Sequence, residues 1–321
     1  MNIAGIVVNY RTPELTLQVV SSLRAEMKSL APFCIYLVDN ASGDNSVPLF
    51  KEAMERDRWQ GEVELIAAPR NGGFGYGINQ AVRRALALEA PPDCFYILNS
   101  DAFADPGSLA RMVAFLAGHP EAGLAGSHIR GTDGTTQVSR FRFPSLWSEL
   151  EASARVGLLT RLLHSHVVSL PLPTSDCEVD WISGTSMLIR RSTFEGSGLF
   201  DEGYFLYYEE IDFCRSASKA GFKSYFVADA PITHIGAVST GMVDETRPMP
   251  SYWFDSRHRY FRKHHGMAYA TACDVARTLG LLIWQTKERA LGRPGKGRPR
   301  MVRDLLAASW KNFLSLRRAP S

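Results

Sequence analysis

One tripeptide in this 321-residue sequence has the residue types and the position expected of a metal-binding loop. Asn99, Ser100 and Asp101 directly follow the apolar run at residues 94–98. A carboxylate at the end of a strand can hold Mg²⁺ or Mn²⁺ against a diphosphate, because hard cations prefer oxygen ligands. The same three residue types are common in turns, so only the place after a strand favours the metal interpretation.

A second segment, residues 200–215, combines carboxylates with aromatic rings. Its acids are Asp201, Glu202, Glu209, Glu210 and Asp212, and its aromatic residues are Phe200, Tyr204, Phe205, Tyr207, Tyr208 and Phe213. Sugar faces pack on aromatic rings, and one carboxylate among them can deprotonate a hydroxyl. The alternative is the start of an amphipathic helix, where acids favour the first turn. We predict a functional site, because exposing so many aromatic rings to water on a solvated face would be unfavourable.

Two loops have features suited to a nucleotide. Asp39 ends an apolar run, where it can accept hydrogen bonds from a base or ribose or can cap the next helix; the sequence leaves both open. The run at residues 70–77 has four glycines in six positions before a helical segment that contains Asn79. Backbone N–H groups there can approach phosphate or sugar oxygens, although a tight turn is an alternative. His234 can complete Mn²⁺ coordination, but a single histidine is more often structural.

This glycine-rich run does not match two common nucleotide motifs. It lacks the Gly-Lys-Ser/Thr end of a Walker A loop. It also does not follow the first strand, as a dinucleotide fingerprint should, which argues against a nicotinamide-dependent dehydrogenase.

The elements that must position these residues alternate strands with helices. Strands are predicted at 3–8, 34–38, 63–67 and 95–98, and helices at 13–27, 47–58 and 77–88. Continuous apolar strands of this kind form a parallel sheet buried on both faces, and ligands bind beyond the carboxyl ends of such strands. All four strands are followed by polar residues, so we expect the site at this edge.

The rest of the chain is predicted to continue the sheet and then become helical. We expect a helix at 107–117, a strand at 122–127, one or two amphipathic helices within 146–169, and strands at 180–190 and 224–227. From residue 253 the pattern is helical and basic, with a linker at 291–300 and a final amphipathic helix at 301–316. Its apolar stripe is Val302, Leu305, Leu306, Phe313 and Leu316.

Composition limits the class of protein. A hydrophobic content of 45% supports a globular core, and a net charge of +3 argues against a nucleic-acid partner. Five cysteines without CxxC spacing fit a reducing cytoplasm. The first residues are interpreted as a buried strand rather than a signal peptide, and no transmembrane helix is predicted. Residues 287–318 contain ten Lys/Arg against two acids.

Taken in order, these motifs resemble family 2 inverting glycosyltransferases, in particular the rhamnosyltransferase-like branch that builds bacterial cell-surface polysaccharides. The resemblance covers about residues 3–265. The residues that carry it are Val7 to Tyr10, Val38 to Ser42, Asn71 to Gly75, Leu98 to Asp101, Gly184, Arg190, Arg191, Glu209 to Arg215 and His234.

The resemblance implies a GT-A fold over residues 1–265, followed by a helical, basic extension over 266–321. It also implies a nucleotide diphosphate sugar donor, with dTDP-rhamnose as the first choice, and a carbohydrate or lipid-linked acceptor. Mg²⁺ or Mn²⁺ would bridge the diphosphate through Asp101, with His234. The implied donor-binding residues are Val8, Asn9, Tyr10, Asp39, Asn71, Gly72, Gly73, Phe74, Asn79, Asn99, Ser100 and Arg215. Trp181, Gly184, Thr185 and Tyr208 would lie on the acceptor side.

The sequence departs from the family pattern at two positions. The base of the family is usually the second acid of a Glu-Asp pair, and Glu210 occupies that position here, so Glu209 or Asp212 is an alternative base. Asn99 replaces the first carboxylate of an Asp-x-Asp metal motif. A binding protein without catalysis is therefore one alternative. A nucleotidyltransferase is another, but it normally has a basic glycine-rich loop after the first strand, and Asn9-Tyr10-Arg11 has no glycine.

The basic carboxyl-terminal segment has two interpretations. It is either a solvated extension or a surface that attracts anionic lipid head groups and brings the enzyme to a lipid-linked acceptor. The second is favoured, which predicts a cytoplasmic protein on the inner face of the plasma membrane.

Overall fold

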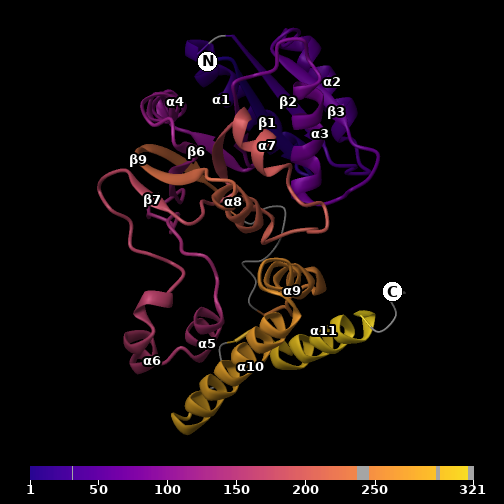
Figure 1. Ribbon diagram of the computed structural model, residues 1–321. Helices are drawn as coiled ribbons and strands as arrows, with labels where there is room; N and C mark the ends of the chain where they lie inside the picture. Colours follow the sequence, from indigo (N-terminus) through magenta and orange to yellow (C-terminus); the bar gives the residue numbers. More distant parts are fainter. Residues whose placement is uncertain (31, 237–245, 294–296, 317–321) are drawn as a thin grey trace. The chain divides into compact units, whose positions relative to one another are not determined.

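Four parallel strands joined by helices form the first part of the sheet in the computed structural model, which describes residues 1–30, 32–236, 246–293 and 297–316 (Figure 1). These elements are β1 (Ile3–Asn9), α1 (Pro13–Met27), η1 (Lys28–Leu30), β2 (Phe33–Asp39), α2 (Ser46–Arg56), β3 (Val63–Ala67), α3 (Phe74–Leu86) and β4 (Cys94–Leu98). The strand order is β3-β2-β1-β4, and all three pairings are parallel. The predicted βαβαβαβ pattern is confirmed. The order reverses direction between β1 and β4, which is where open sheets of this type bind ligands.

The remaining strands make the sheet mixed. They follow as β5 (Ala102–Ala104), α4 (Ser108–Gly118), β6 (Ala122–Arg130), β7 (Cys177–Val179), β8 (Ser186–Arg190), α7 (Arg191–Ser197), α8 (Glu209–Lys219) and β9 (Lys223–His234). The order continues as β4-β8-β6-β9-β5, and β7 also pairs with β9. Only β6 and β9 are parallel in this part.

The single strand predicted at 180–190 is wrong: the structure has two shorter strands, at 177–179 and 186–190. Residues 177–179 pair with β9, whereas 186–190 pair with β4 and β6, so the chain must bend between two partners. The bend contains Ser183 and Gly184, residue types that favour turns over strand interiors.

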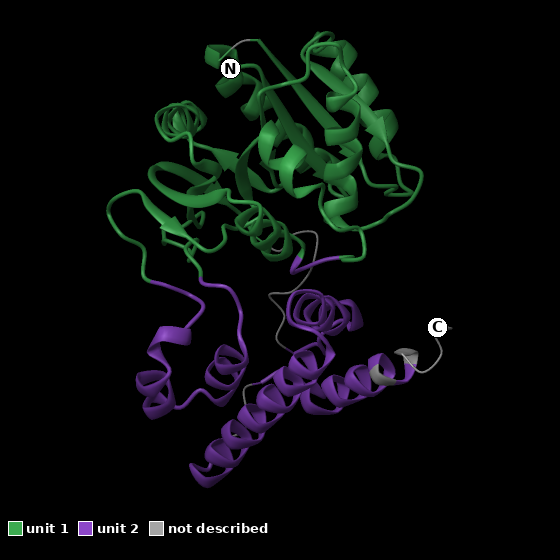
Figure 2. Ribbon diagram, in the orientation of Figure 1, with its two compact units in different colours: residues 1–141, 171–205, 209–241 green, residues 142–170, 206–208, 242–321 purple. Residues whose placement is uncertain are grey.

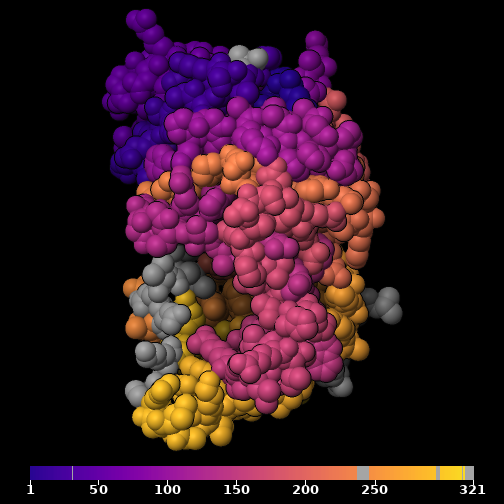
Figure 3. All heavy atoms as spheres, turned by 90° about the vertical axis from the view of Figure 1, so that its left-hand side faces the viewer, coloured from indigo at the N-terminus to yellow at the C-terminus, as the bar shows by residue number. Residues whose placement is uncertain are grey.

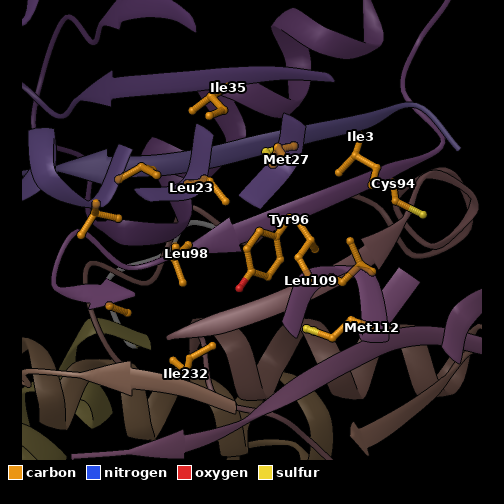
Figure 4. Close-up of a cluster of buried hydrophobic side chains, with 14 of the residues drawn as sticks. Ile3, Leu23, Met27, Ile35, Cys94, Tyr96, Leu98, Leu109, Met112 and Ile232 are labelled. Carbon is orange, nitrogen blue, oxygen red and sulfur yellow. The ribbon is translucent and has the colours of Figure 1, made fainter. Parts of the chain in front are cut away.

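Helices cover both faces of the sheet. On one face, α1, α2 and α4 bury side chains such as Leu23, Phe50 and Met112 against Ile35 and Tyr96 in one cluster (Figure 4). On the other face, rings from α7 and α8 pack on the sheet, with Phe194 meeting Phe95 edge to face at 5.2 Å. Burial on both faces explains why β1, β2 and β4 are nearly uninterrupted apolar runs.

The chain divides into two compact units (Figure 2). Unit 1 holds residues 1–141, 171–205 and 209–241 and contains the whole sheet; unit 2 holds 142–170, 206–208 and 242–321. The helices of unit 2 are α5 (Leu146–Ala154), α6 (Gly157–Leu162), η2 (His164–His166), α9 (Ser251–His265), α10 (Met267–Ala290) and α11 (Met301–Leu316). This division differs from the predicted boundary after residue 265, because α9 packs on α10 and α11.

A buried ionic network holds unit 2 together. The Arg257 guanidinium is fully buried and contacts the carboxylates of Glu149 on α5 and Asp274 on α10. Arg277 also donates to Glu149, at 3.0 Å. Burial alone would raise the pKa of Glu149, but the charges of Arg257 and Arg277 hold it below its ordinary value. This network ties α5, α9 and α10 to one another.

Part of the predicted apolar stripe of the last helix is used inside unit 2. Leu305 is buried against Phe254 and Leu281, and Val302 packs on the same cluster. Leu306 is 52% exposed, and the side chains of Phe313 and Leu316 lie outside the described residues. No described helix is long and apolar enough to cross a membrane.

Candidate active site

Asp101 and His234 form a pair at the edge of the sheet. Asp101 precedes β5 and His234 ends β9; these strands are antiparallel, with Ala102 opposite His234. The Asp101 Oδ1 and His234 Nε2 atoms are 3.1 Å apart. Their side chains are only 9% and 15% exposed. The sheet thus brings together the two residues that the sequence proposed as metal ligands.

Gln137 orients the imidazole of this pair and was not found from the sequence. Its Oε1 atom lies 3.4 Å from His234 Nδ1. If Nδ1–H donates to Gln137 in a neutral ring, Nε2 carries a lone pair that faces the Asp101 carboxylate. A proton or a cation must then lie between the two acceptors. Metal-binding histidines commonly have a hydrogen-bond partner of this kind on their other ring nitrogen. Gln137 lies in a polar loop after β6 and carries no sequence signal of this role.

Glu209 and Glu210 begin α8 and are held in an environment that disfavours charge. Burial, followed by repulsion from Glu210, raises the pKa of Glu209 well above its ordinary range. Burial raises the pKa of Glu210 to about 7. The Oε2 atom of each is buried and has no hydrogen-bond partner in the described part of the chain. Glu209 is almost completely buried, whereas Glu210 is half-buried, so Glu210 is the acid that a substrate can reach.

The other two polar candidates on α8 differ from this pair. Asp212 is 2% exposed and accepts a hydrogen bond from the Tyr204 hydroxyl at 3.1 Å. That geometry favours a structural role for Asp212 over a role as the base. Arg215 is half-buried in the second turn of the helix.

The bend between β7 and β8 connects the acid pair to the metal-site candidates. A Cβ atom on Gly184 would lie 3.7 Å from Glu210 Cβ, so the Glu210 side chain packs on this glycine. On the same segment, the Thr185 carbonyl accepts the Asn99 N–H at 2.9 Å. Leu98 pairs with Ser186, so β4 and this segment lie side by side up to Asn99. Asn99 and Glu210 therefore contact the same short segment, and Asp101 follows Asn99 by two residues.

The polar ends of β1 and β2 form one hydrogen-bonded cluster. The Asn9 amide and the Ser42 hydroxyl donate to Asp39 Oδ1 at 2.8 and 2.6 Å, and the Ser42 N–H donates to Oδ2 at 3.1 Å. Asp39 thus closes its own loop and does not cap α2, which begins after Asn45, and one carboxylate lone pair is left for another donor. Nearby, Val8 is buried and Tyr10 is half-buried under the Arg11 guanidinium.

The glycine-rich run packs tightly against protein. A Cβ on Gly72 would meet the Tyr76 ring, and a Cβ on Gly73 would overlap the Phe205 carbonyl oxygen. Asn40 joins this run to the Asp39 loop, because its amide donates to Asn71 Oδ1 at 3.1 Å. The Phe74 ring approaches Gly184. These contacts favour the tight-turn interpretation of the glycines.

Two asparagine side chains near this run differ in their hydrogen bonding. Asn79 is fully buried, with its amide donating to Phe200 O at 2.8 Å and its Oδ1 accepting Phe200 N–H at 3.1 Å. That geometry favours a structural role for Asn79. By contrast, the buried Oδ1 of Asn40 has no hydrogen-bond partner among the described residues, so it is an acceptor that a ligand can use.

Replacing Gly73 by alanine should destabilise the protein by about 3 kcal/mol. Its φ of +94° is costly for any residue with a Cβ, and the added atom has no space beside Phe205. Gly107→Ala is the matched control, because its φ is +82° but open space surrounds it, so about 1 kcal/mol is expected. Urea unfolding of both variants measures the difference; equal losses would contradict the packing role.

The residues proposed for the acceptor side fall in both units. In unit 1, Trp181 stacks on Phe141 with ring centroids 3.9 Å apart, and Thr185 lies in the bend described above. Tyr208 belongs to unit 2, where its ring packs 5.6 Å from Tyr260. Tyr207 and Tyr208 both have positive φ values, 67° and 68°, immediately before the acid pair. Such strained backbone costs roughly 1–3 kcal/mol per residue and is concentrated at functional sites.

The Glu209→Gln variant should be more stable than the natural protein above neutral pH. The pKa of Glu209 is raised on folding, so the folded state binds a proton that the unfolded state has released. This bound proton favours the folded state at low pH, and the stabilisation is lost as pH rises through the pKa of Glu209 in the folded protein. We expect the variant to melt a few degrees higher at pH 8 and to lose this advantage near pH 4. A melting-temperature difference that does not change with pH would contradict the assignment.

Comparison with known proteins shows the family to which this sequence belongs. The sequence model described as "Glycosyl transferase family 2" matches residues 6–169, about half of the chain. The N-acetylglucosaminyl-diphospho-decaprenol L-rhamnosyltransferase of Mycobacterium tuberculosis is 30% identical over 231 residues, covering 65% of this chain and 69% of that protein. The chain belongs to glycosyl transferase family 2. It is a glycosyltransferase that uses a nucleotide-sugar donor, as the resemblance implied.

A second sequence relative and a solved structure are also similar to this chain. The low-salt glycan biosynthesis hexosyltransferase Agl10 of Haloferax volcanii is 25% identical over 282 residues, covering 87% of this chain and 80% of that protein. The solved mannosyltransferase PcManGT of Pyrobaculum calidifontis, in complex with GDP-Man and Mn²⁺, superposes with a TM-score of 0.60 at 15% identity, covering 98% and 87% of the two chains. The predicted GT-A fold, with helices after the sheet, is confirmed.

Proposed function

We propose that this family 2 enzyme transfers rhamnose from dTDP-rhamnose to a hydroxyl of a lipid-linked carbohydrate acceptor, with inversion at the anomeric carbon. The observation that carries the mechanism is the acid pair: Glu210, with a pKa near 7 and an unpaired buried oxygen, packs on the segment that also bonds to the Asp101 loop. The choice of rhamnose and of a lipid-linked acceptor is supported by the relative from M. tuberculosis, whose name contains both.

The metal would be held by Asp101 and His234. No group of three or more metal-binding side chains occurs among the described residues, so the donor diphosphate must supply further ligands. Mg²⁺ and Mn²⁺ sites in nucleotide enzymes commonly combine few protein ligands with phosphate oxygens. A carboxylate oxygen and an imidazole nitrogen are both ligands that Mn²⁺ accepts, and Asp101 Oδ1 and His234 Nε2 face each other at 3.1 Å. The residues fit the ion, which when bound neutralises charge on the leaving diphosphate.

The chain's own residues carry the proton transfer. Glu210 accepts the acceptor's hydroxyl proton as that oxygen bonds to the anomeric carbon. The bond from that carbon to the diphosphate oxygen breaks, and the nucleoside diphosphate leaves with the electron pair. A pKa near 7 suits a base at neutral pH, because part of the population is ionised and still basic. Burial and repulsion from Glu210 raise the pKa of Glu209, which disfavours a second negative charge beside the base.

Direct assay tests this proposal. The purified chain, Mn²⁺, dTDP-rhamnose and an N-acetylglucosaminyl diphosphate lipid should release dTDP and give a rhamnoside of inverted configuration. A chain that binds nucleotide sugars in a thermal-shift screen but never transfers would be a binding protein. Release of pyrophosphate from a nucleoside triphosphate and a sugar phosphate would indicate a nucleotidyltransferase. Either result contradicts the proposal.

A further inference from the structure

One face of α10 exposes a row of large apolar side chains. Val275, Leu279, Leu282 and Ile283 are 53%, 51%, 45% and 42% exposed. Their spacing of three, four and seven residues places them on one side of the helix. We call them the α10 apolar face. The opposite side of α10 packs into unit 2 through Cys273, Gly280 and Leu281, so the exposed row is not needed for that packing.

The α10 apolar face carries no charge over most of its length. The other exposed residues between 268 and 286 are Ala268, Thr271 and Thr286. Clusters of exposed apolar side chains on one element mark contact surfaces, because solvated helices normally show charges there. Sequence reasoning missed this face, since Asp274 and Arg277 interrupt the apolar run. Both side chains instead turn inward to the ionic network.

The exposed charged residues in the described part of 251–314 are basic. They are Arg262, Lys263, Arg289, Arg293, Arg300, Arg303 and Lys311, of which Arg303 pairs with Asp304 and Lys311 with Asp255. The acids in this range, Asp255, Asp274, Glu288 and Asp304, are all at least partly buried. A surface with this balance attracts anions and repels cations.

A basic pocket lies where α10 ends and α11 begins. It has a volume of about 330 Å³, and its lining includes Arg289, Arg298, Arg300 and Arg303 with Glu288 as the only acid. The end of α10, drawn in yellow, is at the surface in Figure 3. Guanidinium groups bind phosphate through paired hydrogen bonds. We call this site the arginine pocket.

We propose that unit 2 docks on an anionic phospholipid bilayer through the α10 apolar face, with basic residues that flank α10, such as Arg289 of the arginine pocket, binding the lipid phosphates. The apolar side chains would enter the boundary between head groups and acyl chains, and the arginines would bind lipid phosphates. The surrounding positive charge selects this occupant, because a second copy of the chain would bring the same basic surface against itself. The proposal rests on the proposed function for its purpose, delivery of the enzyme to a lipid-linked acceptor. It adds α10 to the membrane contact predicted for 301–316, where Leu306 and Trp310 are also exposed.

Sedimentation with vesicles of phosphatidylglycerol and phosphatidylcholine tests the docking. The full chain should bind these vesicles and should bind pure phosphatidylcholine far more weakly. The Leu279→Gln/Ile283→Gln double variant should bind about tenfold more weakly or worse, since two apolar side chains no longer leave water. Arg289→Gln/Arg300→Gln should lose the preference for anionic lipid. High salt should weaken binding of the natural chain.

The matched control is Leu158→Gln/Leu162→Gln on α6, where both leucines are more than 65% exposed in the same unit. This variant should bind vesicles like the natural chain. Equal binding by the α10 and α6 variants, or no vesicle binding by the natural chain, overturns the proposal. So does sedimentation equilibrium showing a dimer that the α10 variant alone disrupts. Donor turnover without acceptor lipid is measured separately, so failure of the docking and failure of the proposed function are distinguishable.

Discussion

Glu210→Gln should lower kcat by about 10²–10⁴-fold while leaving donor affinity nearly unchanged. This is the usual contribution of a positioned general base. Glutamine keeps the size of the side chain and its packing on Gly184, so the loss reports proton transfer rather than folding. The natural enzyme should also show activity that rises with pH through an apparent pKa near 7, the value set by burial of Glu210. The variant should lose this rising limb.

Glu209→Gln is the matched control for the base. It removes the neighbouring acid without removing the half-buried group that a substrate can reach. We expect it to keep most of kcat and the rising pH limb. If Glu209→Gln abolishes turnover while Glu210→Gln retains it, the roles of the two acids are reversed. Measurement of kcat and KM from pH 5 to 9 separates these outcomes.

Asp101→Asn should lower kcat by about a thousandfold at ordinary Mn²⁺ concentrations. An amide is a much weaker ligand than a carboxylate, and loss of charge neutralisation on the diphosphate costs several kcal/mol. High Mn²⁺ should restore part of the rate. Removing the metal from the natural enzyme with a chelator should have a comparable effect, reversed by adding Mn²⁺ or Mg²⁺.

Asp105→Asn is the control for this substitution. Asp105 also lies beside β5 and β9, but its carboxylate pairs with Arg130, away from His234. A partly exposed ion pair contributes about 0–1 kcal/mol, so the control should keep its activity and its Mn²⁺ dependence. Full activity of Asp101→Asn after chelation would show that catalysis does not depend on this site.

Strands β1, β2 and β4 were predictable because they are buried on both faces, and they end within one residue of the predicted ends. The edge strand Val63–Ala67 and the helix Pro13–Met27 match the predicted boundaries. Periodicity gave no information on which strands pair. The antiparallel insertion of β8 beside β4, which places Gly184 near Glu210, depends on contacts between residues about ninety positions apart.

The side-chain roles were only partly predictable. Sequence patterns identified Asp101, His234 and the acids at 209–212 as candidates, and topology then separated them: Asp212 bonds to Tyr204, while Glu210 stays accessible. Gln137 was missed because an amide in a polar loop has no periodic signal. Asn79 was interpreted as a ligand-binding residue. In the structure its amide donates hydrogen bonds to residues 200 and 202, which lie more than a hundred positions away in the sequence.

A crystal structure of the enzyme with Mn²⁺ and dTDP would show whether the metal and the base share one site. We expect one Mn²⁺ ion bound by Asp101 and His234 Nε2 and by diphosphate oxygens, with the open side of the diphosphate facing Gly184 and the Glu210 carboxylate. An ion bound elsewhere, or a diphosphate with Glu210 on the far side of the sheet edge, would contradict it.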